Sequence, residues 1–183
     1  KAKFSEPSIN ASDIIKEIPA EDSRPHTIIQ QTPETPMQDV FQPGATYPKE
    51  GVKRRFLCMN LIGSITSRAD DGYNAIEITF SDSSQRRPVR MADNYDFGVA
   101  SLGSCGALFG SQTDSDDNIR HKTNISTLFF KPFDSWAHNS EWSMSLPEGD
   151  SVETVAVGDH WCAATTSSGY LRCFRSSGLQ LTP

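Results

Sequence analysis

Cysteine and histidine are among the residue types of this chain that could supply a nucleophile, a base or a metal ligand. The chain has 183 residues, with four cysteines and four histidines. They are Cys58, Cys105, Cys162, Cys173, His26, His121, His138 and His160. No two cysteines have the C-x-x-C spacing of a zinc ribbon or finger. Because there is no secretory signal, we predict four free, buried thiols and no metal site.

The sequence motifs of catalysis and phosphate binding are missing. There is no G-x-S-x-G nucleophile elbow and no G-x-x-x-x-G-K-[ST] phosphate loop. His160 follows Asp159 at a predicted hairpin, where we expect a solvated turn and not a base paired with a nucleophile. The acidic run Asp114, Asp116 and Asp117 lacks the glycine and the closing glutamate of a calcium loop. We therefore predict no enzyme activity, no catalytic residue, no cofactor and no metal.

The charge balance argues against broad nucleic-acid binding. The 17 Lys and Arg residues face 23 Asp and Glu residues, which gives a net charge of −6 and a pI near 5.2. Phosphate-driven binding needs a basic face. Two local clusters, Lys53-Arg54-Arg55 and Arg86-Arg87, could still contact phosphate or serve as part of a nuclear signal, and flanking charge at a domain edge explains them as well. No run of eighteen apolar residues predicts a membrane span.

Residues 1–52 are predicted to be a disordered, proline-rich linker. They hold seven of the eleven prolines and no tryptophan or cysteine. Ser12 could cap a short helix over Asp13–Ile18, which is either a docking peptide or a chance cluster of isoleucines. Thr32 and Thr35 each precede a proline and could be phosphorylated. The chain begins with Lys1 and has no signal peptide, so we expect it to be cut from a longer protein.

Residues 53–183 are predicted to be an all-β domain, because no segment shows a convincing helical period over eleven positions. The predicted strands are Phe56–Arg68, Asn74–Phe80, Val89–Met91, Phe97–Leu102, Cys105–Gly110, Ile125–Lys131, Trp142–Leu146, Val152–Val157, Trp161–Ser167 and Tyr170–Phe174. Each strand has a sequence neighbour with which it can pair. We therefore expect an antiparallel meander.

The predicted hairpins repeat along the chain. Gly103-Ser104 and Gly158-Asp159 each separate two predicted strands, with glycine first as in a type II′ turn. The two glycines are 55 residues apart, or 41 when the polar fourteen-residue insert 111–124 is set aside. The turns at Gly72 and Gly169 are 97 residues apart, or 83 without the insert, which is about two such periods. Four-stranded units of this length are typical of β-propeller blades.

The small residues of each first hairpin, such as Ala100 and Ala156, also suit the crowded axis of a propeller. A β-sandwich with similar turns is the alternative. The strand counts are about three, four and three, which is about two and a half blades. A closed ring needs at least four blades, so we expect an incomplete propeller with open edge strands.

Several sequence blocks in order resemble a known family. They are Arg54–Gly63 (RRFLCMNLIG), Asn74–Asp82 (NAIEITFSD), Gly158–Thr166 (GDHWCAATT) and Tyr170–Phe174 (YLRCF), with Ser135-Trp136 shortly before Ser140-Glu141-Trp142. Over residues 53–183 the chain resembles the N-terminal portion of the middle, SepB-type β-propeller of the And-1 / chromosome transmission fidelity / minichromosome loss family. In that family the propeller is a ring of six blades.

The resemblance implies a nuclear, non-enzymatic replisome scaffold. Such proteins link the replicative helicase complex to DNA polymerase α–primase, form homotrimers, and act in DNA replication, sister-chromatid cohesion and repair on chromatin. Their clients dock largely on a helical bundle that this chain lacks, so no partner-binding residue can be carried over. Two rival functions are an enzyme on a propeller frame and a general WD40-like adaptor outside replication. The alanine, serine and glycine of the inner strands disfavour the first rival, and the missing Gly-His and Trp-Asp dipeptides disfavour the second.

Overall fold

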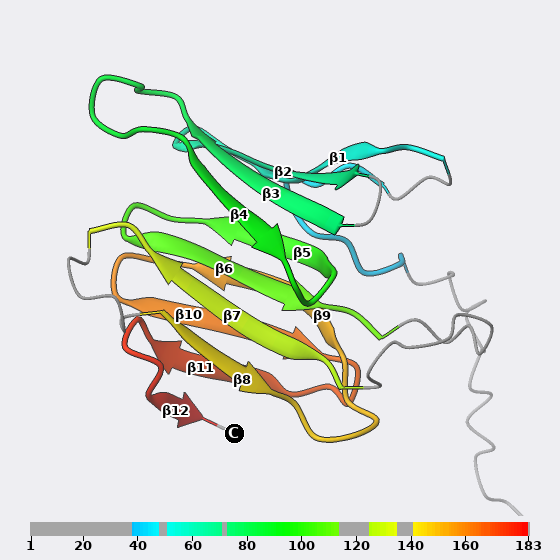
Figure 1. Ribbon diagram of the computed structural model, residues 1–183. Helices are drawn as coiled ribbons and strands as arrows, with labels where there is room; N and C mark the ends of the chain where they lie inside the picture. The colour runs from blue at the N-terminus through cyan, green and yellow to red at the C-terminus, as the bar shows by residue number, and fades with distance from the viewer. Residues whose placement is uncertain (1–37, 48–50, 71–72, 114–124, 135–140, 183) are drawn as a thin grey trace, which may run out of the picture. The chain divides into compact units, whose positions relative to one another are not determined.

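The computed structural model describes residues 38–47, 51–70, 73–113, 125–134 and 141–182. This part of the chain holds twelve β-strands and no helix, so the predicted all-β class is confirmed. No helix of the described residues is therefore available to cross a membrane. The strands form three four-stranded antiparallel sheets, which follow one another along the chain from the cyan to the red part of Figure 1.

Each sheet is a meander, in which strands that are neighbours in the sequence are hydrogen-bonded, as predicted. The first sheet consists of β1 (Arg54–Met59), β2 (Gly63–Asp70), β3 (Tyr73–Phe80) and β4 (Val89–Asp93). The second consists of β5 (Phe97–Leu102), β6 (Gly106–Ser111), β7 (Thr127–Pro132) and β8 (Trp142–Ser145). The third consists of β9 (Val152–Val157), β10 (Trp161–Thr166), β11 (Leu171–Arg175) and β12 (Gln180–Thr182).

The predicted strand counts of three, four and three are wrong, because each sheet has four strands. The single strand predicted over 56–68 is in fact β1 and β2, which are joined by a turn at Asn60, Leu61 and Ile62. Strand β12 was not predicted, because its three residues are too few to show a periodic pattern, and all three are exposed. The described residues thus form three complete sheets and not two and a half.

The second sheet is the centre of the core, because both of its faces are buried. All six residues of β6 are buried. One face packs with Leu57, Ile65, Ile76 and Ile78 of the first sheet. The opposite face packs with Val152, Val155, Cys162, Ala164 and Phe174 of the third sheet. This face-to-face stacking of four-stranded meanders is the arrangement of successive propeller blades.

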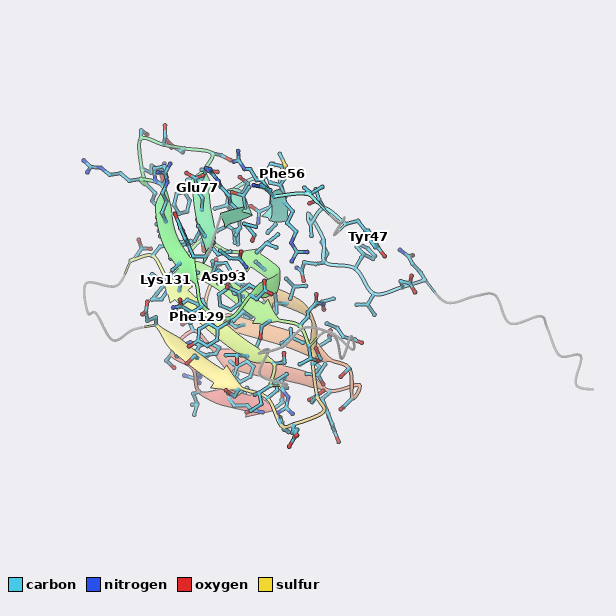
Figure 2. All side chains as sticks on the ribbon, turned by 45° about the vertical axis from the view of Figure 1, so that its right-hand side comes forward. Tyr47, Phe56, Glu77, Asp93, Phe129 and Lys131 are labelled. Atoms are coloured by element: carbon cyan, nitrogen blue, oxygen red, sulfur yellow. The ribbon has the colours of Figure 1, made fainter. Side chains whose placement is uncertain are left out.

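Aromatic rings fill the space between the first and second sheets. Phe97 and Phe109 have ring centroids 5.0 Å apart, and Phe129 lies 5.9 Å from Phe97. Asp93, at the end of β4, accepts the backbone N–H groups of Tyr95 and Phe97 and so fixes the start of β5. Figure 2 shows Asp93 and Phe129 close together where the two sheets meet.

Trp142, in the outer strand of the second sheet, contacts the third sheet at β11 and the residue that follows it. Its indole Nε1 donates to the carbonyl oxygen of Ser176 at 3.0 Å. Its ring lies 5.7 Å from that of Phe130 in the same sheet and 5.5 Å from that of Phe174 in the next. In β8 Trp142 and Met144 are half-buried and Ser143 and Ser145 are exposed, the alternation of a strand with one face on the core.

Residues 38–47, called the strap below, lie against the sheets although we expected them to belong to the linker. The Thr46 backbone N donates to the Phe56 carbonyl oxygen at 2.9 Å, and the Phe56 N donates back to Thr46 Oγ1 at 3.1 Å. Gln42 is only 9% exposed and binds the backbone of Val155 in β9. The strap therefore ties the first strand of the first sheet to the first strand of the third. Figure 2 labels Tyr47 and Phe56 where the strap meets β1.

Candidate interaction surface

Three loops with the same backbone hydrogen bonds join the first and second strands of the three sheets, and they are called the turn edge below. The loops span residues 60–63, 103–106 and 158–161. In each loop the N–H of the first residue donates to the carbonyl oxygen of the fourth at 2.9 Å. The carbonyl oxygen of the third residue accepts the N–H of a residue just after the third strand, and these pairs are Ser81 to Ile62, Phe133 to Cys105 and Ser176 to His160. The repeat predicted from Gly103 and Gly158 is thus confirmed, and it extends to Asn60.

The loops of the turn edge contact one another from sheet to sheet. Asn60 Nδ2 donates to the carbonyl oxygen of Leu102 at 2.7 Å. Ser104 Oγ donates to Asp159 Oδ1, also at 2.7 Å. These side-chain bonds turn three separate hairpin ends into one continuous surface.

Gly103 and Gly158 do not form the predicted type II′ turns. Such a turn needs a positive φ at its glycine, and neither residue has one. Space explains the two glycines instead. A Cβ at Gly103 would lie 2.6 Å from Cγ1 of Val157 in the next sheet, and one at Gly158 would lie 2.2 Å from Nε1 of Trp161. Glycine here permits close packing.

Arg86 holds the loop between β3 and β4 against the second sheet. Its guanidinium lies 5.8 Å from the centre of the Phe80 ring and 5.3 Å from that of Phe133. It also donates to the carbonyl oxygen of Ser104 at 2.5 Å and pairs with Asp134 at 2.5 Å. Arginine suits this position, because its planar, permanently charged guanidinium can stack on rings and donate hydrogen bonds in two directions.

A pocket of about 270 Å³ opens at the turn edge beside Arg86. Its apolar walls are Leu61, Ile62 and Phe80, and its polar rim includes Asp82, Gln85, Arg86 and Ser104. Leu61 is 97% exposed, whereas Ile62 and Phe80 rest on the core between the first two sheets. The residues that form the pocket come from the first two sheets and the loops that follow their strands.

The four cysteines are free, as predicted, but only Cys58 and Cys162 are buried. Burial raises the pKa of the Cys58 thiol, and it raises that of Cys162 to about 12. Burial also raises the pKa of Cys105, which is half-buried at the turn edge. Because the thiolate is the nucleophile, these three thiols are poor nucleophiles at neutral pH.

Asp150 and Arg172 form a buried ion pair in the third sheet. The two side chains are 6% and 14% exposed, and Arg172 Nη2 lies 3.3 Å from Asp150 Oδ2. Burial alone would raise the pKa of Asp150, but hydrogen bonds from Ser168 and Arg172 outweigh it, so that the pKa is lowered. This pair is structural, because it fixes the turn between β10 and β11 and lies apart from the pocket.

The other residues considered for chemistry are not brought together. His160 is exposed at the tip of its loop, as expected. Among the residues with described positions, no three His, Cys, Asp or Glu side chains form a group that could hold a metal ion. Several candidates lie outside the described residues, and these are His26, His121, His138, Asp114, Asp116, Asp117, Thr32, Thr35 and the segment Asp13–Ile18.

The two basic clusters are used partly for contacts between the first two sheets. Arg55 Nη2 donates to the carbonyl oxygens of Phe97 and Gly98 at 3.2 and 3.1 Å. Arg86 forms the contacts given above. Arg54 and Arg87 are exposed. Arg55 and Arg86 therefore have a structural role in this fold. Neither phosphate contact nor flanking charge describes that role.

Sequence reasoning did not find the pocket. The strand predicted over Phe56–Arg68 includes Leu61 and Ile62, because both are apolar and continue the pattern of a strand. Asn60 and Gly63 stand 43 residues before Gly103 and Gly106, close to the predicted period. Extending the repeat by one more period towards the N-terminus would have revealed the loop.

Comparison with known proteins places residues 39–182 in one family. They match the family described as "Minichromosome loss protein, Mcl1, middle region". The match begins within the strap and ends in β12, so that it includes every described strand.

Three relatives are similar over most of the chain. Protein ENHANCER OF LHP1 1 of Arabidopsis thaliana is 43% identical over 145 residues, which are 79% of this chain and 14% of the relative. WD repeat and HMG-box DNA-binding protein 1 of Homo sapiens is 32% identical over 146 residues, 80% of this chain and 12% of the relative. DNA polymerase alpha-binding protein of Saccharomyces cerevisiae is 26% identical over 141 residues, 76% of this chain and 14% of the relative. The chain thus spans 12 to 14% of the length of these relatives.

Proposed function

This chain belongs to the minichromosome loss protein middle-region family, and on that premise we propose that it is part of a non-enzymatic scaffold for DNA replication. The family match over residues 39–182 carries the proposal. The names of two relatives support it, since one is a DNA polymerase alpha-binding protein and the other a DNA-binding protein with WD repeats. We expect the full-length protein to act in the nucleus, on chromatin.

The partners that follow from this proposal are DNA polymerase α–primase and the replicative helicase complex. The name of the S. cerevisiae relative supports the polymerase. The helicase, and roles in sister-chromatid cohesion and repair, rest on the family resemblance of the sequence. The scaffold would hold the polymerase and helicase complexes close together, which raises the effective concentration of each near the other.

We also propose that the three sheets are the first part of a six-bladed, SepB-type propeller that forms homotrimers in the full-length protein. The outer face of the third sheet supports this proposal. Trp161 and Leu171 lie on that face and are 48% and 57% exposed, while the opposite face buries Cys162 and Phe174. A further sheet packed on Trp161 and Leu171 would cover them, as one blade covers the next. In this proposal residues 1–52 form a linker that includes the strap, and residues 53–183 belong to the propeller.

A scaffold without catalysis suits the chemistry of the described surface. The thiols of Cys58, Cys105 and Cys162 have raised pKa values and are protonated at neutral pH. Polar side chains at and beside the turn edge bond to one another, as the Ser104–Asp159 and Arg86–Asp134 pairs do, and to backbone carbonyl oxygens, as Asn60 and Arg86 do. Such groups hold a surface in place.

The experiment that tests this function is affinity purification of the tagged full-length protein from replicating cells of its source, followed by quantitative mass spectrometry. We expect subunits of DNA polymerase α–primase and of the replicative helicase to be enriched over a tag-only control. The mass of the purified protein in solution should be that of three copies. If neither DNA polymerase α–primase nor the helicase were enriched, the replication role would be overturned. A monomeric mass would overturn the trimer.

An adaptor outside replication is the second candidate. The observation that favours it is the name of the A. thaliana relative, which refers to LHP1 and names neither DNA nor a polymerase. The same purification separates the two functions. Recovery of chromatin proteins without any replication protein would favour the adaptor.

A further inference from the structure

The pocket at the turn edge has the size of a side chain. Its volume of about 270 Å³ lies below the roughly 300–1,000 Å³ of sites for cofactors and other small molecules. Among the described residues, its lining comes from the first two sheets and their loops. A pocket of this size at an exposed edge suits one anchoring side chain of a peptide.

The walls of the pocket select an apolar anchor. Leu61 is 97% exposed at one side, and Ile62 and Phe80 form the floor against the core. The Phe80 ring is held edge-on by Phe133, with centroids 5.0 Å apart at an interplanar angle of 87°. An aliphatic side chain placed here would cover Leu61 and leave no polar group of the floor without a partner.

Asp82 supplies the rim with a negative charge that has no counter-ion among the described residues. Asp82 Oδ1 accepts the backbone N–H of Ser84 at 3.0 Å and the Ser84 hydroxyl at 2.6 Å. These hydrogen bonds lower the pKa of Asp82, so that its carboxylate is ionised at neutral pH. Asp82 forms no ion pair within the described part of the chain.

The positive charge of the rim is already engaged. Arg86 pairs with Asp134 and donates to the Ser104 carbonyl oxygen, while the rings of Phe80 and Phe133 flank it. An acidic ligand would have to displace Asp134, whereas a basic ligand meets Asp82 directly. The pocket is also preformed, since Arg86 is held on all of these sides, and a preformed site lowers the entropy cost of binding.

We propose that this pocket binds a short peptide in which a leucine-like side chain is followed by lysine or arginine. The apolar side chain enters between Leu61 and Phe80, and the following cation pairs with Asp82. The acidic net charge of the chain, −6, favours the approach of such a basic peptide. The proposal does not depend on the replication role, because it concerns only what this edge of the sheets can bind.

The test uses the 183-residue chain and a fluorescein-labelled hexapeptide, Gly-Ser-Leu-Lys-Ser-Gly. Two control peptides replace the leucine with serine or the lysine with glutamate. Binding is followed by fluorescence anisotropy and is located by amide chemical-shift changes in an isotope-labelled chain. We expect saturable binding of the first peptide only, with shifts confined to residues 60–63, 81–86 and 104.

Three variants of the chain sharpen the test, and all three residues are exposed. Leu61→Ser should weaken binding about tenfold, the scale of losing a buried aliphatic contact. Asp82→Asn should weaken binding of the lysine peptide severalfold and reduce its salt dependence. Leu179→Ser removes a leucine that is 60% exposed in another turn and should change nothing.

Three results would overturn the proposal. They are equal binding of the leucine and serine peptides, binding that Leu61→Ser leaves unchanged, and tighter binding of the glutamate peptide, which would mean that an acidic ligand displaces Asp134. None of these results would affect the purification test of the replication role, because that test reads the partners of the full-length protein.

Discussion

The side-chain amide of Gln42 binds both backbone groups of Val155, a residue 113 positions further along the chain. Gln42 Nε2 donates to the carbonyl oxygen at 2.9 Å, and the Val155 N–H donates to Gln42 Oε1 at 2.8 Å. Val155 lies in β9, the first strand of its sheet, so these backbone groups face away from β10. The amide thus takes the place of a neighbouring strand.

We expect Gln42→Ala to destabilise the chain by about 1–3 kcal/mol, because it leaves a buried N–H and a buried carbonyl without partners. Urea unfolding followed by tryptophan fluorescence measures the change. Gln38→Ala is the matched control, since Gln38 is exposed, and it should stay within about 0.5 kcal/mol of the unchanged chain. Equal stability of the two variants would show that the strap does not hold the sheets together.

In the basic cluster Arg86-Arg87, we expect Arg86 and not Arg87 to contribute to the free energy of unfolding. Arg86→Ala removes an ion pair, a bond to the Ser104 carbonyl oxygen and two ring contacts, so we expect a loss of about 1–2 kcal/mol. Arg86→Lys keeps the charge but not the planar fork, and it should recover only part of the loss. Arg87→Ala should be nearly neutral, because Arg87 is exposed. The same unfolding measurement compares all three, and a full rescue by lysine would contradict the stacking role.

Gly63 should tolerate substitution less well than Gly98. A Cβ at Gly63 would lie 2.1 Å from the backbone carbonyl oxygen of Thr79, which cannot move without disturbing the β2–β3 pairing. We expect Gly63→Ala to cost about 1–3 kcal/mol or more. The three atoms nearest to a Cβ at Gly98 all belong to the side chain of Gln112, which is exposed and can turn away, so Gly98→Ala should cost little. Thermal unfolding of the two variants decides the matter, and similar melting temperatures would contradict the packing argument.

Local patterns made most of the sheets predictable. Short runs of apolar and small residues, with the glycines at 103 and 158 between them, predict β5, β6, β9 and β10, because each hairpin pairs residues that are close in sequence. The turn between β1 and β2 was missed because Leu61 and Ile62 are apolar and continue the pattern of a strand. Apolar residues at an exposed turn carry no structural signal of their own, although here they line the pocket.

Contacts between distant residues could not be read from the sequence. Gln42 is a polar residue in a proline-rich stretch, and nothing nearby announces a partner 113 positions away. In the sequence Arg86 is one of two adjacent arginines. Its partner Asp134 is 48 positions away, so the pattern does not reveal the ion pair. The period predicted the repeating units, but the side chains that join one unit to the next differ at each junction.

The cysteines should react with alkylating reagents in an order set by burial. Cys58 and Cys162 are 4% and 0% exposed, so the reagent cannot reach them. Their raised pKa values also leave little of the reactive thiolate. Cys105 and Cys173 are half-buried. With iodoacetamide at pH 8, we expect Cys173 and then Cys105 to be labelled, and Cys58 and Cys162 to be labelled only in urea. Peptide mass spectrometry over time measures the order, and early labelling of Cys162 would contradict the packing of the third sheet.

Acid should weaken the third sheet through the Asp150–Arg172 pair. The folded state lowers the pKa of Asp150 below its ordinary value of 3.8, so it binds this proton less tightly than the unfolded chain does. The resulting stabilisation is complete above that value and is lost as the pH falls through the lower, folded pKa. Asp93 has the opposite sign, because burial raises its pKa and its contribution decreases as the pH rises above 3.8.

Urea unfolding between pH 2 and pH 7 of the unchanged chain, Asp150→Asn and Asp93→Asn separates the two effects. Asp150→Asn should lower the free energy of unfolding at neutral pH. It should also flatten the decline below pH 4, because no carboxylate remains at position 150 to be protonated. Asp93→Asn should instead remove the part of the curve that falls with rising pH. Arg172→Lys keeps a cation near Asp150 and should retain the acid decline. If the curve of Asp150→Asn ran parallel to that of the unchanged chain, the pair would not be the source of the acid sensitivity.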